Sequence, residues 1–230
     1  MRLPVKCLLT AVLAGLILSP AFGQLPQLAG LQSMMANGVG KPFLLANEGV
    51  KREIRLSGEQ DNQVRKVFRE VFEKYQPEFR KVQGDREKQT KLVIDSTRET
   101  RDRLDKALPT ILQPEQLKRL NQIQIQVNGI ISFKRPDVLK KLNLSAGQLI
   151  EIGKIGLSLK TDTNKILQDA STAPLRRMPG ALRKVKEMKD AATQKAIEKL
   201  TSEQKQAWQE LTGEKFDLRF ELPMRRGIRP

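Results

Sequence analysis

The chain has 230 residues, and its 42 Lys and Arg residues against 26 Asp and Glu residues give a formal net charge of +16. It has no histidine and one cysteine, Cys7, which excludes histidine-based catalytic triads and metal sites built on imidazole or on several thiolates. Phosphate-binding glycine loops, dinucleotide-binding motifs and nucleophile elbows are also missing from the sequence. We therefore expect no enzyme, no catalytic residue, no cofactor and no metal site.

Residues 1–23 have the pattern of a secretory signal peptide. Arg2 and Lys6 precede a mainly apolar stretch of 12 residues, and small residues at 21–23 favour cleavage between Gly23 and Gln24. Twelve residues are too few to cross a bilayer, which needs about 20 in a helix. Cleavage would remove Cys7 and leave 40 basic residues against 26 acidic ones, a net charge of about +14. We expect a periplasmic or secreted protein, whose charge either serves only solubility or favours anionic surfaces and acidic proteins over nucleic acid.

The next stretches predict an arm followed by one short helix and three further helices. Residues 24–46 contain several Gly and Pro residues and predict a flexible N-terminal arm. A first unit, 47–129, begins with a short helix and continues with two long amphipathic helices, and its last helix starts at Pro114. Pro77 is expected to kink or end the first long helix, and residues 83–91 to form a turn or an exposed helical stretch. Residues 122–127 alternate as a strand would, but the apolar face continues as a helix.

A second unit follows after a short connection. Residues 130–137 predict a linker, and residues 138–213 repeat the pattern of apolar residues, with a break at 171–180 where two prolines lie. Residues 214–230 predict an extended basic tail. Within it, residues 216–222 alternate apolar and charged side chains. This segment is expected to lie on the helices as an extended arm, to pair with another chain, or to form a local helix. The fold class is thus all-α, with two tandem helical-hairpin units and an extended C-terminal arm.

Two pentapeptides recur at an offset of 88 residues, and the spacing within each pair is 56 residues. The sequence LSGEQ at 56–60 returns as LSAGQ at 144–148, and LQPEQ at 112–116 returns as LTSEQ at 200–204. A hydroxyl group three residues before a glutamine is typical of a capping box and occurs in three of the copies, while the copy at 112–116 has Gln113 there and Pro114 at the first helical position. Each motif therefore predicts a helix start, and the repetition predicts a duplication. The motif residues are Leu56, Ser57, Gln60, Leu112, Gln116, Leu144, Ser145, Gln148, Leu200, Thr201 and Gln204.

A signal peptide followed by a basic helical chain with these Leu-Ser/Thr-x-x-Gln motifs resembles the Spy/CpxP family of periplasmic proteins. The resemblance covers about residues 45–212, as two tandem copies of a unit that occurs once in a typical member. It implies an α-helical hairpin scaffold involved in envelope stress or in holding unfolded proteins without ATP. It implies no enzyme. Metal-sensing relatives use histidines, which this chain does not have.

Two sets of residues are candidates for binding. The first consists of aromatic and basic residues of the first long helix, which could hold unfolded clients or, alternatively, form core: Arg65, Lys66, Phe68, Arg69, Phe72, Tyr75 and Phe79. The second is a basic amphipathic stretch, which could bind an anionic surface or, alternatively, be only a solvated face: Arg176, Arg177, Arg183, Lys184, Lys186 and Lys189.

Two functions compete on this basis. The leading hypothesis is an exported, non-enzymatic binding protein, a chaperone or envelope-stress protein that holds unfolded or acidic envelope proteins. The alternative is a structural protein that binds anionic membrane or cell-wall polymer and has no chaperone activity. No nucleic acid partner is expected, and a homodimer is a further alternative. Exposure of the aromatic residues would favour the first hypothesis and their burial the second.

Overall fold

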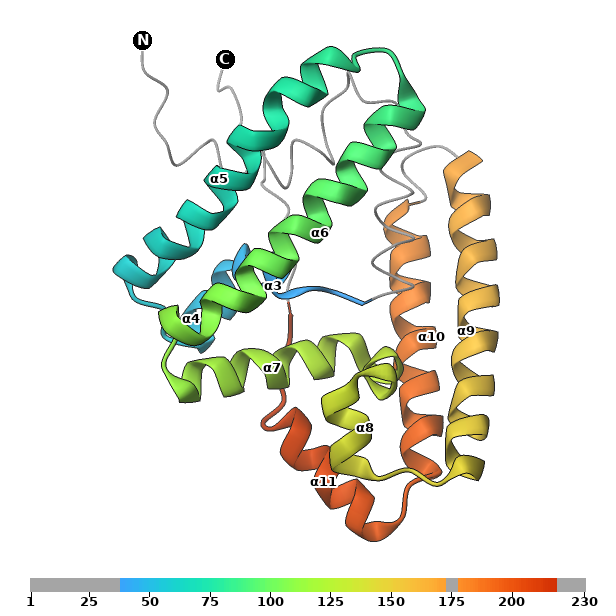
Figure 1. Ribbon diagram of the computed structural model, residues 1–230. Helices are drawn as coiled ribbons and strands as arrows, with labels where there is room; N and C mark the ends of the chain where they lie inside the picture. Colours follow the sequence, from blue (N-terminus) through green and yellow to red (C-terminus); the bar gives the residue numbers. More distant parts are fainter. Residues whose placement is uncertain (1–37, 173–177, 219–230) are drawn as a thin grey trace, which may run out of the picture.

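The computed structural model describes residues 38–172 and 178–218, and within these ranges the chain forms helices and no strand (Figure 1). This confirms the all-α fold class. Residues 1–37, which include the expected signal peptide, residues 173–177 and residues 219–230 lie outside the described residues. The helices are α3 (Lys41–Leu45), α4 (Glu48–Glu53), α5 (Gly58–Lys81), α6 (Arg86–Ile111), α7 (Pro114–Asn128), the 3₁₀ helix η1 (Gly129–Lys134), α8 (Pro136–Leu142), α9 (Ala146–Thr172), α10 (Met178–Glu198) and α11 (Ser202–Thr212).

Two long helical hairpins dominate the structure, and short helices join them. Helix α5 packs against α6, and α9 packs against α10. Figure 1 shows α5 and α9 at opposite sides of the molecule, with α7, α8 and α11 below and between the hairpins. Helix α7 contacts α6 and α3 on one side and α11 and η1 on the other. It therefore connects the two halves of the chain through packing as well as through sequence.

The helix starts repeat at a constant offset along the chain. Helices α4 and α8 start at residues 48 and 136, α5 and α9 at 58 and 146, and α7 and α11 at 114 and 202, so each pair is separated by 88 residues. The turn inside the second hairpin comes three to four residues later than this offset predicts, since α9 ends at 172 and α10 starts at 178. Buried residues repeat as well, in the pairs Val50 and Val138, Ile54 and Leu142, Val64 and Ile152, Val71 and Leu159, Leu104 and Ala192, Leu108 and Ala196, Leu112 and Leu200, and Leu120 and Trp208.

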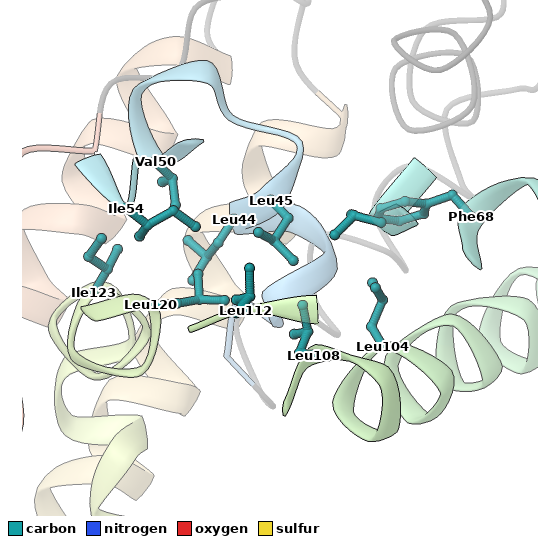
Figure 2. Packing of buried hydrophobic residues seen from close by; sticks show 11 residues of the cluster. Leu44, Leu45, Val50, Ile54, Phe68, Leu104, Leu108, Leu112, Leu120 and Ile123 are labelled. Atoms are coloured by element: carbon teal, nitrogen blue, oxygen red, sulfur yellow. The ribbon is translucent and has the colours of Figure 1, made fainter. Parts of the chain in front are cut away.

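The expected N-terminal arm is wrong for its described part, residues 38–46. Residues 41–45 form α3, and the Leu44 and Leu45 side chains are 0% and 1% exposed. Figure 2 shows Leu44 pointing toward Leu112 and Leu120 in the core of the first half. The Asn128 side chain also holds the main chain of Val39, with Nδ2 donating to the carbonyl oxygen at 3.1 Å. The glycines and prolines here begin a short helix, because Pro42 at its start loses no hydrogen bond.

The expected linker at 130–137 is also wrong. Residues 129–134 form η1, and Pro136 begins α8. Ile130 and Phe133 are 3% and 4% exposed, and the Phe133 ring stacks on Trp208 with ring centroids 4.5 Å apart. This connection lies in the core of the second half, because its apolar side chains fill the space between α7, α9 and α10.

The end of α5 and the start of α6 bear on two further expectations, the effect of Pro77 and the conformation of the stretch that follows α5. Pro77 does not end α5 at Gln76, since α5 runs on to Lys81 with the proline exposed inside it. The stretch after α5 is a turn, and Asp85 then caps α6.

After α11 the chain is non-helical from Gly213 to Leu218, where Phe216 and Leu218 pack on the core of the first half. The described part of the C-terminal segment is thus an extended arm lying on the helices.

Ion pairs join the exposed sides of α5 and α6, with Glu99 at their centre. Its carboxylate accepts hydrogen bonds from Lys74 and Arg103, each at 2.7 Å. The hydrogen bond from Lys74 is the largest cause that lowers the pKa of Glu99 from 4.5 to about 2. A lowered pKa in the folded state means that the stabilisation is present above pH 4.5 and is lost as the pH falls toward 2.

We therefore expect Glu99→Gln to lower the free energy of unfolding at pH 7 by less than about 1 kcal/mol, because water screens ion pairs at the surface. The difference from the unchanged protein should shrink toward zero near pH 2. Urea unfolding at both pH values measures it. Asp102→Asn is the matched control, since Asp102 is exposed on the same helix and pairs with no described residue. An equal loss at both pH values would contradict the assignment.

Candidate functional site

The glutamines of the repeated motifs pair with one another across the fold. The Gln60 side chain donates from Nε2 to Oε1 of Gln116 at 2.7 Å, and the Gln116 Nε2 donates back to Oε1 of Gln60 at 3.1 Å. Each Oε1 also accepts the main-chain N–H of its own helix cap, from Ser57 at 3.0 Å and from Gln113 at 2.9 Å. Two helix starts that lie 56 residues apart in the sequence are thereby joined in one hydrogen-bonded unit, which we call the glutamine clasp.

The second half of the chain contains the same clasp. Gln148 donates to Gln204 at 2.7 Å, and Gln204 donates back at 3.1 Å. The remaining amide hydrogens bind carbonyl oxygens in both halves: Gln60 donates to Ile111 and Gln148 to Lys199, while Gln116 donates to Ile54 and Arg55 and Gln204 to Leu142 and Asn143. All of these partners keep the offset of 88 residues, so the two clasps are equivalent bond for bond.

The turn that each clasp holds has an uncommon backbone conformation. Arg55 and Asn143 are the non-glycine residues with positive φ in the described ranges, at 51° and 45°, and they also lie 88 residues apart. Asparagine tolerates this left-handed region, whereas arginine adopts it rarely. Their carbonyl oxygens accept from Gln116 and Gln204, so the clasp supports the turn that ends α4 and α8. Sequence reasoning found the caps but missed the pairing, and the constant spacing of 56 residues was the signal for it.

The aromatic candidates of α5 do not form one exposed strip. Phe68 is 8% exposed and belongs to the core of the first half, while Phe72, Tyr75 and Phe79 are partly buried. Of the basic residues in that set, Lys66 and Arg69 are exposed and Arg65 pairs with Asp61 at 2.7 Å. The structure therefore favours the alternative that Phe68 is core, and by the criterion of exposure this set of residues counts against client binding on α5.

The basic candidates of α10 differ in their exposure and in their partners. Arg183 and Lys184 are exposed, and Lys186 is exposed but pairs with Asp190 at 2.8 Å. Lys189 turns inward and donates to the carbonyl oxygen of Val127 in the last turn of α7, where the negative end of the helix favours a cation. Burial lowers the pKa of Lys189. Arg176 and Arg177 lie outside the residues whose side chains are described.

An exposed apolar surface occurs on α9, where sequence reasoning expected only the buried stripe. Ile152, Leu159 and Leu167 face the core, whereas Leu149, Ile150 and Leu157 are 45%, 60% and 65% exposed. Figure 1 shows α9 at the edge of the molecule beside α10. The signal in the sequence was the run of apolar residues that do not fit one face of the helix, since Ile150 and Leu157 fall between the buried positions.

The described residues hold no group of three or more acidic or cysteine side chains placed to bind a metal ion. In the same residues no helix is both long and apolar enough to cross a membrane. Comparison with known protein families, with curated proteins and with solved structures finds no match to this chain. The function is therefore argued from the geometry and charge of the chain itself.

Proposed function

We propose that this protein is an exported, non-enzymatic helical binding protein that holds unfolded or acidic polypeptides without a cofactor. The observation that carries the proposal is the exposed apolar surface of α9 in a chain of net charge +16. Positive charge attracts acidic chains from solution, and exposed apolar side chains then retain them. The likeness of the repeated motifs to those of the Spy/CpxP family supports the same function and a periplasmic location.

We also propose that the scaffold arose by tandem duplication of an 88-residue unit. Helix α3 starts at residue 41 and η1 at residue 129, so these two elements are counterparts as well. The repeated stretches are then 41–128 and 129–216, which include residues 41–46 of the expected arm and all of the expected linker. Equivalent glutamine clasps, equivalent left-handed residues and equivalent buried positions support this proposal.

The alternative function, binding to an anionic membrane or cell-wall polymer, has one observation in its favour. Arg183 and Lys184 are exposed next to each other on α10, and Leu182 beside them is 39% exposed. The inward Lys189 and the paired Lys186 reduce the charge that this face offers. We therefore rank this alternative second.

An aggregation assay tests the proposed function. Reduced α-lactalbumin serves as an acidic client, and the reductant leaves this protein unaffected because Cys7 is its only cysteine. We expect light scattering to fall as purified protein is added. Raising the salt from about 50 to 300 mM shortens the Debye length from roughly 14 to below 6 Å, so capture should slow while release changes little.

Anionic vesicles provide the second arm of this assay. Binding to phosphatidylglycerol vesicles that salt reverses, together with no effect on client aggregation, would overturn the proposed function and favour the surface-binding alternative. Suppressed aggregation without vesicle binding would support the proposal.

A further inference from the structure

The two equivalent long helices differ in their outward faces. In α5 this face carries Asp61, Asn62, Arg65 and Arg69. The positions 88 residues later, in α9, are Leu149, Ile150, Gly153 and Leu157. On α5, Asp61 pairs with Lys51 at 3.0 Å and with Arg65 at 2.7 Å. The face that carries ion pairs on α5 is thus apolar and exposed on α9. We call the surface formed by Leu149, Ile150, Gly153 and Leu157 the α9 face.

The α9 face has a shape suited to another helix. Leu149, Ile150 and Leu157 lie within about two turns, and Gly153 lies between them on the same side. Apart from the neighbouring residues and backbone of α9 itself, no described atom lies within 4 Å of the position where a side chain of Gly153 would begin. The glycine therefore leaves a hollow between two exposed apolar side chains, into which the ridge of a second helix can fit. A glycine inside a helix costs about 1 kcal/mol of stability relative to alanine.

Charge selects the kind of helix that fits. Lys154 lies four residues after Ile150 and three before Leu157, and Lys160 lies three residues after Leu157, so both border the α9 face. Both lysines are exposed and neither pairs with a carboxylate in the described ranges. The carboxylate of the nearby Glu151 forms an ion pair with Lys199, with 3.0 Å between Oε2 and Nζ. A partner with acidic side chains beside its apolar stripe would pair with these lysines.

We infer that the α9 face docks a short amphipathic helix of a partner polypeptide, with an apolar stripe on Ile150, Gly153 and Leu157 and acidic side chains at Lys154 and Lys160. This inference rests on the proposed function and names the surface and the chemistry of the client. A second copy of the chain fits less well, because two-fold packing would bring the unpaired lysines of two strongly positive molecules together. A membrane fits less well because the centre of the face is a hollow without aromatic anchors.

The binding of a designed peptide to the purified protein tests the inference. The probe is a fluorescent helical peptide with a leucine stripe flanked by glutamates, and a second peptide replaces the glutamates with lysines. The variant Ile150→Asn/Leu157→Arg installs the residues that α5 has at these positions. Its matched control is Ile94→Asn/Leu182→Arg, which makes the same kinds of change at residues that are 47% and 39% exposed elsewhere.

Fluorescence anisotropy should show that the variant on the α9 face weakens binding of the glutamate peptide at least tenfold, because the two docked side chains together contribute at least about 1.4 kcal/mol. The control variant should bind within twofold of the unchanged protein. Lys154→Glu should weaken the glutamate peptide and favour the lysine peptide. Lys66→Glu, the same change at the equivalent position of α5, should do neither.

Several results would overturn the inference. Equal weakening by both double variants would place the peptide elsewhere. A dimer in analytical ultracentrifugation that the α9 variant dissociates would assign the face to a second copy, and loss of vesicle binding in that variant alone would assign it to membrane. Peptide binding that appears only after deletion of residues 24–37 would assign it to the chain's own N-terminal segment. If both double variants suppress client aggregation equally well, the α9 face is rejected as the binding surface but the proposed function stands. If the unchanged protein does not suppress aggregation, the proposed function itself is rejected.

Discussion

Replacing Leu44 with alanine should lower the free energy of unfolding by about 2–5 kcal/mol. The side chain is 0% exposed and belongs to the cluster that includes Leu108, Leu112 and Leu120. Truncation removes apolar contacts and leaves a cavity that the surrounding helices fill only in part. A loss of this size is a large fraction of the stability of an ordinary domain. Urea unfolding followed by circular dichroism gives the value.

The matched control for this prediction is Leu182→Ala, the same substitution at a leucine that is 39% exposed on α10. It should change the stability by less than about 1 kcal/mol, because much of the leucine surface is already in contact with water. If Leu44→Ala costs no more than the control, residues 38–46 are the loose arm that the sequence suggests. The packing of this segment against the core of the first half would then be wrong.

The second large effect is expected at the glutamine clasp. Gln116→Leu removes the donor to the carbonyl oxygens of Ile54 and Arg55, each at 3.0 Å, and both hydrogen bonds with Gln60. It also removes the acceptor for the Gln113 N–H. Each lost bond costs about 0.5–1.5 kcal/mol, and several of these groups are partly buried. We expect the free energy of unfolding to fall by about 2–4 kcal/mol.

The substitution Gln63→Leu provides the control, because Gln63 is exposed on α5, one turn beyond the clasp. It should change the stability by less than about 0.5 kcal/mol. Gln60→Leu and Gln116→Leu combined should cost less than the sum of the single changes, since each alone leaves the other amide without its partner. Strict additivity would show that the two glutamines act only as separate helix caps.

At the candidate sites, the helix caps could be predicted from the sequence, whereas the contacts between distant residues could not. The capping residues Ser57 and Thr201 could be assigned because a cap depends on residues within four positions of each other. The pairing of Gln60 with Gln116 does not follow from local rules, because nothing within a few residues specifies which side chain meets the amide group, and only the repeated spacing of 56 residues pointed to it. The same holds for Phe68, which lies on an amphipathic face whether that face meets the core or a client.

The sequence by itself determined the all-α class, the places where the capped helices begin and the offset of 88 residues, because these follow from local propensity and repetition. Only the tertiary structure decided which apolar segments are buried. Residues 38–46 and 130–137 have the composition of an arm and a linker, yet Leu44 and Phe133 lie in the two cores. The physical reason is that burial depends on which distant segments pack together, so Leu44 is enclosed by α6 and α7 while Ile150 and Leu157, equally apolar, stay 60% and 65% exposed.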